Sequence, residues 1–164
     1  MPVRNYDPRQ GQAFQGDVAI IPIPGDIAIA TTEEIPPVQG RLVLQAGELT
    51  GHHHAIDLFE RVARFRDDGL ARSLSSRAAA RRRQASAPPR ATAHLYRDAA
   101  AAEQMVSRGL LTRFDLAIGC LVVAGGAVVV SHEEHDGIRV PPGNYLIGRQ
   151  IEGALQGGPR AVFD

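Results

Sequence analysis

Short runs of Val, Ile and Leu, each bounded by Gly or Pro, recur along this chain of 164 residues. β-branched residues favour extended strands, and Gly and Pro favour the turns between them. The composition, with 17 Gly, 11 Pro and only 5% aromatic residues, also favours strands and turns over a helical bundle. The length suits one domain with a real core. We therefore predict a single mainly β domain over 1–164, a small barrel or sandwich, with strands over 18–24, 41–46, 50–56, 91–96, 116–130 and 145–151.

Two glycines divide the longest apolar stretch of the chain. Gly125 and Gly126 separate the two halves of 116–130, and each half has the β-branched composition of a strand. A tight turn between two apolar runs is typical of a hairpin, so we predict that these strands pair with each other. Upstream, Ala, Glu, Gln and Met at helical spacing predict a helix that ends before Gly109.

The segment 58–90 departs from the strand pattern. It is rich in Ala and Arg, and its part 61–90 contains nine Arg against Asp67 and Asp68, a net charge of +7. The rest of the chain has nine Arg and sixteen acidic residues, so the formal total is zero. We predict an insertion, helical or disordered, within the single domain. Its charge suits a solvated or subunit-contacting segment and, as an alternative, phosphate contacts with nucleic acid.

Five of the six histidines fall in two clusters, GELTGHHHAI at 47–56 and SHEEHDGI at 131–138. Side chains alternate across a strand, so His52 and His54 share one face and His53 takes the other. His132 and His135 are three residues apart and come together on a helical turn or a tight bend, which the following Asp-Gly pair favours. The spacing therefore offers two imidazole pairs that can converge.

Converging imidazoles with a carboxylate are a typical ligand set for Zn²⁺, or for Fe, Mn or Ni in a more open geometry. Three protein ligands would leave a position for water, which the metal activates while a glutamate accepts the proton. The candidate metal ligands are His52, His54, His132, His135 and Glu48, and the candidate acid/base residues are Glu134 and Glu133. The competing interpretation is that His52 and His54 are hydrogen-bonded in a polar turn and that His132 and His135 lie in a solvated loop. We expect His53 to be a bystander and His94 a hydrogen-bonded strand residue.

Several function classes lack their motifs. The sequence contains no phosphate-binding loop, dinucleotide fingerprint or serine-hydrolase elbow. Its single cysteine, Cys120, lies in an apolar run and is expected to be a buried thiol in a reducing compartment. We find no signal-peptide pattern and no apolar stretch long enough for a membrane helix. We therefore expect a cytoplasmic protein without a membrane partner.

The motifs resemble those of a family of small uncharacterised bacterial and phage proteins. The shared pattern is QGDV, then GExTGHxH, HEEH and PPGxY with a following Gln; here these motifs occupy 15–18, 47–54, 132–135, 141–145 and 150. The resemblance skips the Arg-rich middle and implies that the clustered histidines belong to a shared core.

A looser resemblance is to the cupins, which are metal-binding β-barrels. Gly47, His52, His54 and Glu60 approximate the first cupin motif with shifted spacing, and the Pro-Pro-Gly at 141–143 matches part of the second. The histidine that should follow is absent, so His132 or His135 would have to replace it. The resemblance implies a cupin-like barrel as the nearest analogue.

These patterns lead to one main functional prediction and two alternatives. The main prediction is a divalent-metal-dependent hydrolase or lyase that acts on a small-molecule substrate and forms a homo-oligomer. The first alternative is a non-enzymatic assembly protein whose histidines form a closed metal site or a subunit interface. The second is a nucleic-acid-binding protein that uses the Arg-rich insertion.

Overall fold

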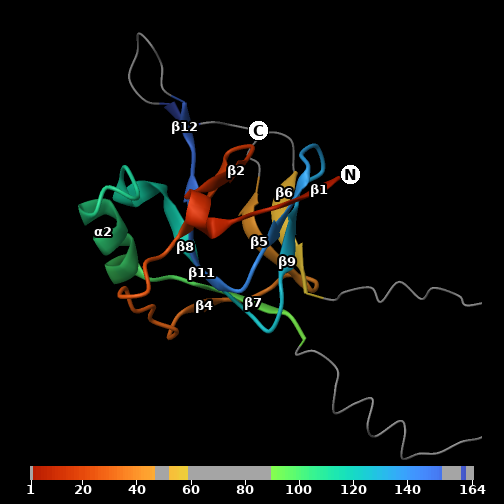
Figure 1. Cartoon of the computed structure of the whole chain (residues 1–164), viewed down its shortest axis with the longest axis horizontal. Helices are drawn as coiled ribbons and strands as arrows, with labels where there is room; N and C mark the ends of the chain where they lie inside the picture. The colour runs from red at the N-terminus through yellow and green to blue at the C-terminus, as the bar shows by residue number, and fades with distance from the viewer. Residues whose placement is uncertain (1, 47–51, 59–89, 153–159, 162–164) are drawn as a thin grey trace, which may run out of the picture.

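The computed structural model describes residues 2–46, 52–58, 90–152 and 160–161 (Figure 1). Within these ranges the chain is mainly β, as predicted: two main sheets, a separate two-stranded pair and one α-helix. The pair joins β12 (Ile151–Glu152) to β13 (Arg160–Ala161). The predicted insertion falls almost entirely on 59–89, outside the described residues, as do Glu48 and Glu60.

One sheet has five strands. Their order is β1 (Val3–Asn5), β10 (Gly137–Val140), β9 (Val128–Ser131), β6 (His53–Asp57) and β5 (Arg41–Ala46). Only β1 and β10 run parallel; the other neighbours in this sheet are antiparallel. Both histidine clusters therefore lie on this sheet, on or next to the paired strands β6 and β9.

The other sheet has six antiparallel strands. Their order is β2 (Ala13–Gln15), β3 (Val18–Pro22), β11 (Gly143–Arg149), β8 (Ala117–Ala124), β7 (Thr92–Tyr96) and β4 (Glu34–Ile35). The strands predicted from the Val/Ile/Leu runs are thus present, with boundaries that differ by a few residues. Two short 3-10 helices, η1 (Pro8–Gln10) and η2 (Phe114–Leu116), lie in the connections.

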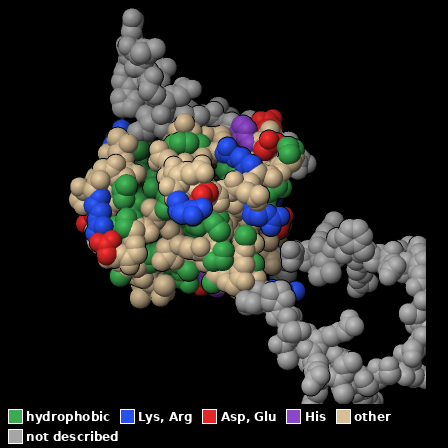
Figure 2. Space-filling model, viewed as in Figure 1, with side chains coloured by type: hydrophobic (Ala, Val, Ile, Leu, Met, Phe, Trp, Pro, Cys, Tyr) green, Lys and Arg blue, Asp and Glu red, His purple; other side chains and the backbone are tan. Residues whose placement is uncertain are grey.

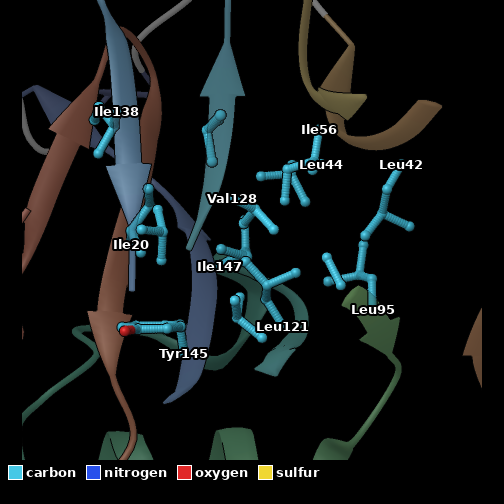
Figure 3. Close-up of a cluster of buried hydrophobic side chains, with 14 of the residues drawn as sticks. Ile20, Leu42, Leu44, Ile56, Leu95, Leu121, Val128, Ile138, Tyr145 and Ile147 are labelled. Atoms are coloured by element: carbon cyan, nitrogen blue, oxygen red, sulfur yellow. The ribbon is translucent and has the colours of Figure 1, made fainter. Parts of the chain in front are cut away.

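The two sheets face each other across a shared hydrophobic core (Figure 3). The core takes side chains from both sheets, for example Ile20 and Leu121 from the six-stranded sheet and Ile56 from the five-stranded one. Across the described residues neither sheet closes on itself, so the barrel alternative is not formed there. The described residues therefore do not form the closed barrel that the cupin-like analogue implies.

The middle strands of the six-stranded sheet, β3, β11 and β8, have buried side chains on both faces. On the face away from the shared core, Ala19, Cys120 and Leu146 belong to a second cluster with Met105 of α2 (Ala99–Ser107). Figure 1 shows α2 on the opposite side of this sheet from the five-stranded sheet. The predicted helix before Gly109 is therefore present. No helix within the described ranges is long and apolar enough to cross a membrane.

The predicted hairpin at Gly125-Gly126 is wrong. β8 belongs to the six-stranded sheet and β9 to the five-stranded sheet, so the two glycines carry the chain from one layer to the other. Gly125 has a positive φ of 74°, which glycine adopts without strain. β8 already pairs with β11 on one edge and with β7 on the other, so β9 cannot pair with it.

Candidate functional site

Four buried polar side chains stand out in the described part of the chain. Gln15, Asp17, His54 and His132 are 3%, 4%, 1% and 6% exposed, respectively. Burying a polar group costs free energy unless the protein supplies partners for it. Contacts between these side chains join them into one cluster, described below, so this burial is concentrated at a single place.

The β2–β3 turn supplies two of the four residues. Gln15 ends β2 and Val18 begins β3, which leaves Gly16 and Asp17 as a two-residue hairpin turn. Gly16 has a φ of 52°, and glycine at the first turn position is typical of a tight hairpin. The backbone carbonyl of Asp17 accepts a hydrogen bond of 2.7 Å from the N–H of Gln150, which holds the turn against the end of β11.

His54 lies between Gln15 and Asp17. Its Nδ1 is 3.0 Å from Oε1 of Gln15, and its Nε2 is 2.8 Å from Oδ1 of Asp17. The Gln15 amide nitrogen donates to the carbonyls of Asp136, at 2.7 Å, and Val130, at 3.3 Å. The imidazole is therefore held on both nitrogens by the β2–β3 turn, which belongs to the other sheet.

The structure brings together the four histidines that the sequence proposed as metal ligands. The rings of His54 and His132 stack with centroids 4.2 Å apart, and those of His132 and His135 stack at 4.6 Å. His52 meets His132 edge-on at 5.7 Å. His135 joins this group because the chain bends tightly over 133–135 after β9.

The two glutamates of the second cluster have different contacts. Glu133 accepts a 2.8 Å hydrogen bond from the backbone N–H of His53, and this bond lowers the pKa of the Glu133 carboxyl below its ordinary value. Glu134 donates its backbone N–H to Nδ1 of His132 at 3.1 Å, and its carboxylate lies 3.7 Å from Nδ1 of His52. Glu133 thus ties the two clusters together, while the exposed Glu134 carboxylate lies beside His52. Figure 2 shows histidine and acidic side chains side by side at the surface.

Among the described residues, no three His, Cys, Asp or Glu side chains surround one point as metal ligands do. The reason is visible in the stack: rings inclined by only 26° and 22° direct their nitrogen lone pairs along nearly parallel planes. Asp17 is the site residue that the sequence reasoning did not assign, although the QGDV motif contains it.

An open hollow lies next to the cluster. It has a volume of about 370 Å³ and is lined by Arg4, Phe14, Gln15, Gly16, Glu134, His135 and Asp136. This volume is within the range of small-molecule sites. The cluster is therefore buried at His54 and accessible from solvent at Glu134 and His135.

The remaining two histidines are His53 and His94. His53 contributes its backbone N–H, as described above. His94 on β7 lies 2.7 Å from Oε1 of Glu34 through its Nδ1 and stacks on Tyr96 at 6.2 Å, with its side chain 46% exposed. His94 is therefore a hydrogen-bonded strand residue, as expected.

A comparison with known protein families matches residues 14–84 to a domain of unknown function, DUF8820. The match covers less than half of the chain but includes the β2–β3 turn and the first histidine cluster. No curated protein matches the chain. No solved structure matches it either.

Proposed function

We propose that the protein binds one divalent transition-metal ion between His54 and Asp17, with neighbouring imidazoles as further ligands. The observation that carries this proposal is the buried nitrogen–oxygen pair, with Nε2 and Oδ1 2.8 Å apart and the two side chains 1% and 6% exposed. A buried carboxylate needs a positive charge beside it. At this position the charge is either a proton on the imidazole or a metal ion.

The surroundings favour a metal ion over a proton. An imidazolium–carboxylate pair needs one histidine, whereas here the ring centroids of His132 and His135 lie 4.2 and 6.3 Å from that of His54, and His52 contacts His132 at 5.7 Å. Imidazole and carboxylate together suit Zn²⁺, Fe, Mn or Ni. To bind through Nε2, His132 would exchange its hydrogen bond from Glu134 for a protonated Nδ1. The stacked rings would also have to rotate so that their nitrogens point at one ion.

A metal-dependent hydrolase or lyase is the activity that this site would support. A bound divalent ion supplies a water of lowered pKa near neutral pH. Glu134 lines the open hollow beside His52, and its carboxylate would accept a proton there. The hollow gives a small-molecule substrate access. The two facing sheets, which we assign as a β-sandwich backed by α2, supply a rigid frame for these residues.

Metal content of the purified protein tests the proposal. We expect about one equivalent of a transition metal, measured by elemental analysis after reconstitution and desalting. Asp17→Asn should lose it, because the substitution keeps the shape of the side chain and removes the charge. Glu134→Gln should keep the metal and lose any hydrolysis of ester or phosphoester test substrates that the wild type shows.

His94→Ala is the matched control. It removes an imidazole that lies outside the cluster, so its metal content should equal that of the wild type. Far-ultraviolet circular dichroism confirms that each variant is folded. Metal-free wild type after reconstitution, or equal metal in wild type and Asp17→Asn, would contradict the proposed site and leave the imidazolium–carboxylate pair.

A further inference from the structure

We infer that Gln15 is the positioning residue of this site: it selects the tautomer of His54 and thereby the nitrogen that faces Asp17. Its part in metal binding rests on the proposed function. Its effect on the tautomer is a property of the metal-free protein and is measured separately. Gln15 reaches His54 from the opposite sheet and is itself 3% exposed, so its amide is fixed by its contacts.

The direction of the Gln15 amide follows from its neighbours. Its Nε2 lies 2.7 Å from the carbonyl oxygen of Asp136 and 3.3 Å from that of Val130. Carbonyl oxygens only accept hydrogen bonds, so the NH₂ group must point at them. The reversed amide would place two oxygens 2.7 Å apart. Oε1 is therefore the atom that faces His54.

This direction determines where the proton of His54 lies. An amide oxygen can only accept, so the imidazole Nδ1, 3.0 Å away, must donate. Nε2 is then the nitrogen at which a proton and a metal ion compete. That nitrogen is the one 2.8 Å from Oδ1 of Asp17. Acceptors that hold the second ring nitrogen in this way orient histidine ligands in metal sites.

The same amide also connects the two histidine clusters. Val130 lies on β9 just before His132, and Asp136 follows His135, so the two hydrogen bonds hold both ends of the bend that carries the second cluster. A change at Gln15 should therefore alter the His54 tautomer and loosen the bend. Two substitutions separate these effects.

Gln15→Leu removes both effects, and Gln15→Glu removes only one. A carboxylate at position 15 still accepts from Nδ1, but it cannot donate to the two carbonyls. Long-range ¹H–¹⁵N correlation spectra of metal-free protein should show a proton on Nδ1 of His54 in wild type and Gln15→Glu. Gln15→Leu should shift the population toward Nε2–H. Gln12→Leu, an exposed residue before β2, should resemble wild type.

Titration of chelator-treated protein with Co²⁺ measures the functional consequence. We expect Gln15→Leu to weaken binding by about 10- to 100-fold, the range found for such supporting partners. Gln15→Glu should fall between it and the wild type. An unchanged His54 tautomer or an unchanged Co²⁺ affinity in Gln15→Leu overturns the inference. A wild type that binds no Co²⁺ contradicts the proposed metal site, while the tautomer change would still support the role of Gln15.

Discussion

Cys120 shows how strongly burial acts on a single residue. It lies on β8 with no exposed surface, in the cluster between the six-stranded sheet and α2. Burial, and to a lesser extent the negative charge of Asp98, raises the pKa of the Cys120 thiol to about 12. A thiol with this pKa forms almost no thiolate at physiological pH and is a poor nucleophile.

We therefore predict that Cys120 is unreactive in the folded protein. Ellman's reagent at pH 8 should modify it at a rate far below that of the urea-unfolded chain. Because the unfolded thiol loses its proton near its ordinary pKa of 9.0 and the folded one near 12, stability should fall as the pH rises through this interval. Rapid modification without urea would show that β8 opens locally.

The histidines show how far sequence reasoning reaches at the residue scale. Strand alternation predicts that His52 and His54 lie together, and both do contact His132. Alternation says nothing about which strand of the other sheet faces them. The partnership of His54 with Asp17 depends on the packing of the two sheets, and only the QGDV motif pointed to that turn.

Elements were easier to predict than their pairing. The Val/Ile/Leu runs correctly predicted β3, β5, β7 and β8, because the preference of these residues for an extended strand is a local property. The Gly125-Gly126 turn was assigned to a hairpin because the same composition fits a corner between layers. The choice between the two depends on which edges of β8 other strands occupy, and β11 comes later in the chain.

At the scale of one element, the start of α2 is a sensitive point. Oδ1 of Asp98 accepts a 3.0 Å hydrogen bond from the N–H of Ala101, and Oδ2 accepts a 2.7 Å bond from the N–H of Ala30. The first bond caps the helix, and the second ties the preceding loop to it. Asp98→Ala should lower the free energy of unfolding by about 2 kcal/mol, roughly half from each contact.

Urea denaturation at neutral pH measures this loss. Asp98→Asn keeps one acceptor oxygen and should lose less. Glu103→Ala, at an exposed position of the same helix, should change the free energy of unfolding by less than about 0.5 kcal/mol. An effect of Asp98→Ala no larger than that of the control would mean that α2 is held by its buried apolar side chains and not by this cap.

For the whole molecule, the cluster is a bridge between the sheets. His54 comes from the five-stranded sheet, and Gln15 and Asp17 come from the β2–β3 turn of the six-stranded one. An ion bound between His54 and Asp17 would therefore connect the two layers in the folded state. The unfolded chain does not hold these groups together, so binding should stabilise the entire domain.

The size of that stabilisation follows from mass action. At a metal concentration of ~100 times Kd, binding to the folded state alone adds about 2.7 kcal/mol. For a chain of this size, each kcal/mol raises Tm by roughly 2–4 °C, so we expect an increase of about 5–10 °C. Differential scanning calorimetry across a metal titration measures it. Asp17→Asn should show no concentration-dependent rise and His94→Ala the full one, because only the first removes a link between the sheets. A rise of equal size in both variants would place the ion elsewhere.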